Sequence, residues 1–286
     1  MIFLPLCILS STLILVVFKL LERFRINIVT AIVINYFTAA TLGYLAGDRS
    51  TFAPLAADWV IMALLIGFFF VFMFYVIAYS TRVAGITVTS LTTKLSVAIP
   101  VLFSIIRFSE EVTFLKVSGM VLALAAIAMI VYRPQDKRAG VVAMVILPMV
   151  LFFGAGFIDS MIKYAQEMYV TERDTLHFPT FTFMVASVIS LLVRVTRGGS
   201  KSDARWYHII GGGMALGMVN FGSLYFMVMA LESGFLDSSV VFGINHIGIV
   251  LLSAFIGAVI FSERLSILNR SGIAVAVIAI TALLYA

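Results

Sequence analysis

The sequence predicts an all-α integral membrane protein, and three of its features carry that prediction. The 286-residue chain is 62% hydrophobic and only 12% charged, and its mean hydropathy is +1.14. Soluble domains carry about 25% charged residues, so a water-exposed fold would leave too much apolar surface in water. The apolar residues also lie in runs of about twenty, the length of a helix that crosses a bilayer. Transmembrane strands would instead show alternating runs of about ten residues.

Ten apolar segments follow one another along the chain, and we expect each to form one transmembrane helix. They cover residues 2–21, 26–46, 58–79, 85–106, 113–132, 141–164, 178–196, 206–231, 236–260 and 266–285. No Lys or Arg precedes the first segment, so it lacks the charged region of a signal peptide and is expected to remain as the first helix. Cys7 is the only cysteine of the sequence, which excludes an intrachain disulfide.

A motif that occurs twice indicates an internal duplication. Phe108-Ser109-Glu110 closes the fourth segment, and Phe261-Ser262-Glu263 closes the ninth, 153 residues later (263 − 110 = 153). Ser118-Gly119 and Ser271-Gly272 open the segments that follow, with the same shift (272 − 119 = 153). Each copy of the duplicated unit therefore holds five segments.

We expect two five-helix repeats, residues 1–132 and 141–286, joined by a cytoplasmic linker at 133–140. Because each repeat holds an odd number of helices, the second enters the membrane in the opposite orientation to the first. Inverted repeats of this kind are typical of secondary transporters, which hold the substrate near the middle of the membrane between the two repeats.

The loop charges predict the orientation of the chain. Thirteen of the 19 Lys and Arg residues lie at the loops after the first, third, fifth, seventh and ninth segments, whereas five lie at the other loops. Loops rich in Lys and Arg stay in the cytoplasm, so we expect both termini outside, in the inner (cell) membrane of a prokaryote. The net charge of +5 then reflects topology and predicts no nucleic-acid partner.

With ten segments in two halves and a Phe-Ser-Glu motif closing the fourth and ninth segments, the chain resembles the drug/metabolite transporter superfamily, in its EamA-type branch. The resemblance implies a basket-like bundle around a central cavity lined by the first, third, fourth, sixth, eighth and ninth segments. Members of the superfamily move amino acids, sugars, nucleotide-sugars and drugs. The chain differs from commoner members in carrying Lys94 and the pair Asn245-His246.

Lys94 is the first candidate site residue, because it lies near the middle of segment 85–106. A charge at that depth costs at least about 3 kcal/mol, so the side chain is expected to face a cavity or a partner rather than lipid. It either anchors an anion or a coupled ion, or forms a structural ion pair with a buried carboxylate.

Asp159 is the natural counter-charge of Lys94. Lys163 lies one turn further along the same segment, so Asp159 either pairs with Lys163 on one helix face or faces the cavity. Facing the cavity, it could carry a proton. Asn245 and His246 lie near the repeat counterpart of Lys94 (94 + 152 = 246) and are also candidates.

Asn220 is a candidate because the eighth segment is expected to line the cavity. Hydrogen bonds between helices, worth about 0.6–2 kcal/mol, are the alternative explanation for Asn220 and for Asn245-His246. Glu110 and Glu263 are expected to have a structural role, since each opens the last helix of its repeat and carboxylates are stabilised at helix N-termini. Pro100 predicts a kink in segment 85–106.

These features predict a secondary transporter that moves a small polar or amphipathic metabolite or drug by alternating access. The sequence contains no GxxxxGK[ST] loop, so we expect no ATP hydrolysis. We also expect no cofactor. If transport is coupled to an ion, we expect that ion to be a proton or sodium. We expect a monomer or homodimer in contact with membrane lipid. The alternatives are a flippase or exporter of lipid-linked or amphipathic substrates and, more remotely, an intramembrane enzyme.

An enzyme is not expected, because the three histidines, His177, His208 and His246, lie on different segments without metal-type spacing. No metal site is therefore predicted.

Overall fold

The computed structural model describes residues 2–48, 52, 54–108, 112–131, 146–171, 174–196, 205–232, 238–263 and 265–285. These residues are helical with short connections and contain no strand, which confirms the all-α class. The elements are α1 (Phe3–Arg23), α2 (Ile28–Ala46), the 3-10 helix η1 (Pro54–Ala56), α3 (Val60–Val83), α4 (Ile86–Leu95), α5 (Ala98–Phe108), α6 (Phe114–Val131), α7 (Leu147–Met168), α8 (His177–Thr196), α9 (Trp206–Glu232), α10 (Ser238–Val259) and α11 (Ile267–Leu284).

Seven helical spans of the described residues are long and apolar enough to cross a membrane, which agrees with the predicted membrane class. One of them runs from Ile86 to Arg107 and joins α4 to α5. Large apolar side chains point outward from α3 and α8, where Phe68 is 54% and Leu192 is 60% exposed. In a soluble protein such residues would face water, whereas in a bilayer they contact lipid.

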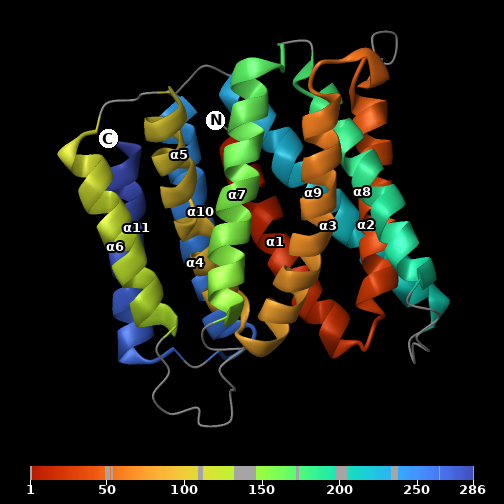
Figure 1. Ribbon diagram of the computed structural model, residues 1–286. Helices are drawn as coiled ribbons and strands as arrows, with labels where there is room; N and C mark the ends of the chain where they lie inside the picture. The colour runs from red at the N-terminus through yellow and green to blue at the C-terminus, as the bar shows by residue number, and fades with distance from the viewer. Residues whose placement is uncertain are drawn as a thin grey trace.

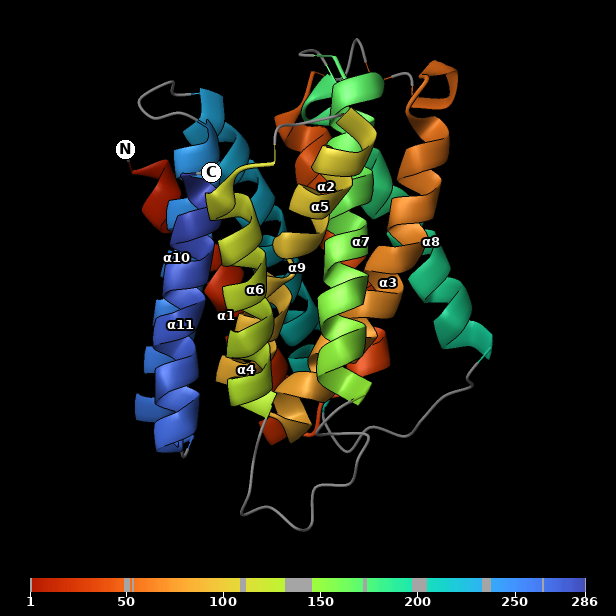
Figure 2. The same cartoon turned by 60° about the vertical axis from the view of Figure 1, so that its left-hand side comes forward.

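The helices stand side by side in an elongated bundle (Figures 1 and 2). At one edge α6 packs along α11, and at the other edge α2 packs along α8. Between these edges α1 packs on α9 and α10, while α7 packs on α3, α4 and α5. The remaining strong contacts join α2 to α9, α3 to α8, α4 to α10 and α10 to α11.

Polar side chains fix where several helices begin. Asn27 caps α2 by accepting a hydrogen bond from the backbone N–H of Thr30 at 3.0 Å. At α11 the Ser266 hydroxyl accepts from the backbone N–H of Asn269, and the Asn269 side chain accepts from the Ser266 N–H, both at 3.1 Å. Such caps satisfy donors that the first turn of a helix leaves free.

Segment 85–106 is broken into α4 and α5 rather than being one continuous helix. Pro100 lacks the N–H that would bond to Ser96, and the carbonyl of Ser96 instead accepts from the N–H of Ile99 at 2.8 Å. The Ser96 hydroxyl also donates to the carbonyl of Thr93 at 2.6 Å. The break therefore lies at Ser96 and Val97, directly after Lys94, and agrees with the kink expected from Pro100.

Candidate functional site

Lys94 lies in the last turn of α4, with a half-buried side chain. In the described part of the chain, its ammonium group makes neither a hydrogen bond nor an ion pair within 4.0 Å. The charge nevertheless acts electrostatically on Cys7 of α1, Asp159 of α7 and His246 of α10. Four helices thus bring ionisable groups together around one cation.

Asp159 is half-buried near the middle of α7. Among the described residues, no ion pair within 4.0 Å joins its carboxylate to Lys94 or to Lys163, so neither close pairing considered from the sequence is present. A Cβ atom at Gly156 would lie 2.5–2.9 Å from the side chain of Ile99. This close approach places the turn of α7 that carries Asp159 beside the break between α4 and α5.

α10 contributes two polar groups that the described residues leave without a hydrogen-bond partner. They are the side-chain oxygen Oδ1 of Asn245, a residue only 5% exposed, and the ring nitrogen Nδ1 of His246. Gly248 allows α1 to approach here, because a Cβ on it would lie 2.5–3.2 Å from the Ile8 side chain. Buried polar groups without partners in a protein normally bind water or a ligand.

α4 supplies further unpaired groups that the sequence analysis did not single out. The hydroxyl oxygens of Ser90 and Thr92 are buried without a partner among the described residues. Ser90 lies one turn before Lys94 and hence on the same helix face. One pattern could have identified these residues: six of the ten residues from Thr87 to Ser96 carry hydroxyl groups, which is unusual for a segment of this mean apolarity.

Cys7 was also missed as a site residue, because a lone cysteine in an apolar helix resembles any small buried side chain. It is 1% exposed, and its Sγ lies 3.1 Å from the carbonyl oxygen of Ser223 on α9. The sequence gives no pattern that could have placed it near Lys94.

Asn220 lies elsewhere, in the contact between α9 and α2. Its side-chain Nδ2 is 3.2 Å from the amide group of Asn35, and both residues are buried. A hydrogen bond between helices therefore accounts for Asn220. Lys163 is half-buried one turn beyond Asp159, toward the end of α7.

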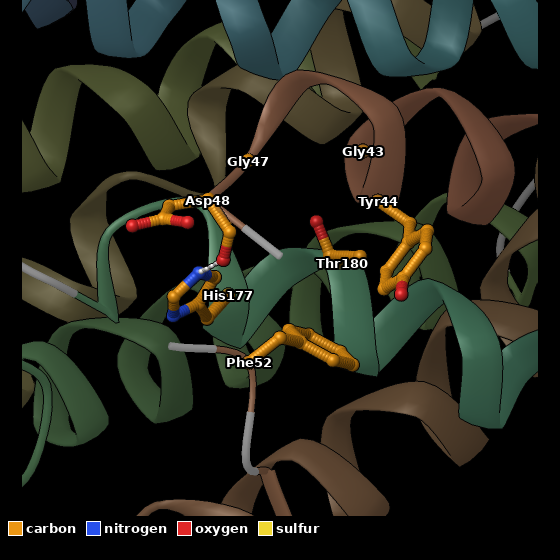
Figure 3. A pocket seen from close by; sticks show the side chains of 7 residues that line it. All are labelled: Gly43, Tyr44, Gly47, Asp48, Phe52, His177 and Thr180. Carbon is orange, nitrogen blue, oxygen red and sulfur yellow. Dashed lines mark hydrogen bonds between the residues drawn. The ribbon is translucent and has the colours of Figure 1, made fainter. Parts of the chain in front are cut away.

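A shallow crevice lies at a different place in the bundle, between the end of α2 and the start of α8 (Figure 3). His177 fills its centre, with Nε2 3.1 Å from the carbonyl oxygen of Asp48 and Nδ1 4.0 Å from the Asp174 carboxylate. The ring of Phe52 covers His177 with a centroid separation of 5.4 Å. Because His177, its central polar group, already has partners, we interpret the crevice as part of the interface between α2 and α8.

Glu263 has a structural role, as expected, but the helix that it caps is different. Its carboxylate accepts hydrogen bonds from the N–H groups of Ile86 at 2.6 Å and Thr87 at 3.2 Å, which open α4. The helix that follows Glu263, α11, is capped by Ser266 instead. Glu110, its sequence counterpart, lies outside the described residues.

No protein-family model matches the chain. An uncharacterized protein of Haemophilus influenzae is 27% identical over 285 residues, which cover 97% of this chain and 96% of that protein. The similarity therefore extends over all the helices and both predicted repeats.

Proposed function

We propose that the chain is a secondary transporter that moves a small polar or amphipathic metabolite or drug across a membrane by alternating access. The observation that carries this proposal is the unpaired ammonium of Lys94 inside a helical bundle. A charge without a partner in a membrane interior is tolerated only beside water or a solute. The neighbouring unpaired groups of Ser90, Asn245 and His246 provide further hydrogen bonds to such a solute.

The solute site offers groups of both signs. Lys94 attracts an anionic or strongly accepting group, while Asn245 Oδ1 accepts a hydrogen bond from a donor on the solute. Asp159 belongs to the same electrostatic group and could exchange a proton with the site during transport. A solute with separate accepting and donating groups fits this arrangement better than a purely apolar one.

The packing of the helices supports ten membrane helices in two inverted repeats, 1–132 and 141–286. In this scheme α4 and α5 form one broken membrane helix, and α1, α2, α3, α4–α5 and α6 correspond to α7, α8, α9, α10 and α11. The contacts of α1 with α9 and α10 then correspond to those of α7 with α3 and α4–α5. The α2–α9 contact likewise corresponds to α8–α3, and α5 and α10 end at opposite ends of the bundle (Figure 1).

Several contacts lack an equal counterpart and break this correspondence, and three of them, which involve α1 or α4, support a two-state cycle. α1 packs on α3 and α4, and α11 packs on α4, whereas the counterpart pairs α7–α9, α7–α10 and α6–α10 lack comparable contacts within the described residues. Two related halves with unequal contacts are expected when a transporter is closed at one end. If the two halves exchanged their contact patterns, the end of the bundle held by these contacts would open and the opposite end would close.

Basic residues support the orientation with both termini outside. Lys19, Arg23, Arg25 and Arg82 lie where α1 and α3 end, which is the end of the bundle where Lys19 joins α1 to α3. Lys/Arg-rich ends face the cytoplasm. In this orientation we infer that the end held together by these contacts is the cytoplasmic one.

Solute transport into proteoliposomes tests this function. Purified protein would be reconstituted and offered radiolabelled organic anions, amino acids, sugars and amphipathic drugs, with and without a proton or sodium gradient. Saturable uptake of one class, competed by its unlabelled form, would support the proposal. Movement of fluorescent lipid between leaflets without solute uptake would favour the flippase alternative.

A further inference from the structure

The turn between α3 and α4 joins two helix ends of opposite polarity. The last carbonyl groups of α3 carry partial negative charge, and the first N–H groups of α4 carry partial positive charge. Only Ala84 and Gly85 separate the helices, and Gly85 has φ = +92°, a backbone conformation that favours glycine. Both sets of free backbone groups thus need partners within a few ångströms of one another.

A cation from α1 binds the α3 side of this turn. Lys19 Nζ donates to the carbonyl oxygens of Thr81 at 3.0 Å and Arg82 at 3.5 Å. Glu22 supports the cluster, since its carboxylate lies 3.8 Å from Lys19 Nζ and 3.3 Å from Arg82 Nε. The side chains of Lys19 and Glu22 are 23% and 33% exposed, so water can reach them.

An anion from the α10–α11 connection binds the α4 side of the turn. In addition to the N–H groups of Ile86 and Thr87, the Glu263 carboxylate accepts from the Thr87 hydroxyl at 2.9 Å. Two glycines leave room for it: a Cβ at Gly85 or at Gly257 would lie 2.6 Å from a Glu263 carboxylate oxygen. The backbone N–H of Glu263 donates to the Gly257 carbonyl at 2.8 Å, and this bond holds the backbone of Glu263 in place.

We propose that Lys19 is the releasable latch that closes this end of the molecule, while Glu263 is an anchor that stays in place. This inference rests on the transport cycle proposed above. The α1–α3 contact held by Lys19 has no counterpart between α7 and α9 among the described residues. It therefore belongs to one state of the cycle only.

The anchor joins α4 to the end of α10, two helices that correspond to each other in the proposed repeats. The α4–α10 pair is therefore its own counterpart and remains packed in both states, while the repeat counterpart of Glu263, Glu110, lies outside the described residues. Glu263 follows α10 directly and binds the start of α4. Glu263 makes three hydrogen bonds to the first turn of α4, two of them as short as 2.6 and 2.9 Å, so we expect it to hold the helix that carries Lys94 when Lys19 leaves the α3 carbonyls.

The latch is tested by labelling a single cysteine from one side of the membrane. In a Cys7→Ser background, Ser90→Cys places a thiol one turn from Lys94, and inside-out or right-side-out vesicles expose one membrane side to an impermeant maleimide. Lys19→Gln removes the cation, and we expect labelling from the α1–α3 side to rise about ten-fold, the effect of losing a charge-assisted hydrogen bond. Labelling from the opposite side should fall.

The controls separate a latch from a general loss of structure. Lys19→Arg, which keeps the charge, should label at the parent rate, and so should Arg270→Gln, which removes an exposed charge from α11. If Lys19→Gln does not fold, the Glu22→Gln/Arg82→Gln pair should raise labelling instead. Folded variants that label at the parent rate would overturn the latch. Because no solute is added, this result is independent of whether uptake is observed in proteoliposomes.

Discussion

The α1–α3 pair and the α7–α9 pair are equivalent in the proposed repeats, yet only α1 and α3 pack together within the described residues. All four helices are membrane-type spans, and α1 and α3 are the more apolar pair. In addition, Lys19 on α1 bonds to the last turn of α3. In the proposed cycle, such a polar contact at a helix end would select which end of the bundle is held closed.

The largest expected effect is the difference in labelling between loops on the two sides of the membrane, which tests the orientation of the α1–α3 end. We expect cysteines at Ser50 and Ser200, two positions outside the described residues, to label from opposite sides in a Cys7-free protein. Ser50 should react with an impermeant thiol reagent in intact cells, and Ser200 should react only after permeabilisation. Reaction of Ser200 alone in intact cells would place the closed end outside.

The second largest effect is expected at the anchor on α4. Glu263→Gln removes the charge from three hydrogen bonds and should destabilise the protein by about 2 kcal/mol, because bonds to charged groups contribute about 1.5–3 kcal/mol. Thermal unfolding in detergent would show this as a midpoint lowered by several degrees. Glu167→Gln, at an exposed position on the last turn of α7, is the matched control and should change stability by less than about 0.5 kcal/mol. Equal midpoints for the two variants would contradict the anchor.

The smallest effect on stability is expected at Asp174. This residue precedes α8, at the end of the bundle opposite the α3–α4 turn. Burial raises the pKa of the Asp174 carboxyl, but hydrogen bonds from the hydroxyl and N–H of Thr171 lower the pKa more, so it lies below the usual value. A carboxyl with a lowered pKa stabilises the fold above its unfolded pKa of about 3.9 and loses that contribution as pH falls through the folded pKa.

Asp174→Asn should therefore lower stability at pH 7 by at most about 1 kcal/mol, because solvent screens this group. The difference from the parent protein should disappear below about pH 3. Unfolding midpoints of both proteins across this pH range would measure it. A difference that persists at low pH would assign the effect to packing rather than to charge.

Much of this architecture could be predicted from the sequence because membrane helices have a strong apolar pattern. The all-α class, most helix positions and the break near Pro100 follow from run length and from the missing N–H of proline, although α3 and α7 each end four residues later than predicted. The position of Lys94 inside a helix was visible for the same reason. The grouping of Asp159 and His246 with Lys94 was expected from a midplane argument and stays a prediction, although both groups lie close enough to Lys94 to interact with its charge.

The rest depends on contacts between distant segments, which a local pattern cannot specify. Glu263 lies three residues before the cap of α11, so its sequence position indicates the wrong helix, and only folding brings α4 to it. Asn220 was selected because it is polar, although Asn35 on α2 satisfies it. Ser90 and Cys7 are small enough to be overlooked in apolar segments, and their role depends on which helix faces them.

The most direct test of the central claim is solute transport by Lys94→Met, measured together with its unfolding midpoint. Met keeps the length of the side chain and removes the charge, so we expect the protein to fold with a midpoint near that of the parent while transport is abolished. A lower midpoint that Asp159→Asn restores would instead assign Lys94 a structural role as the counter-charge of Asp159. Full transport by folded Lys94→Met would contradict the claim that this lysine is the centre of the solute site.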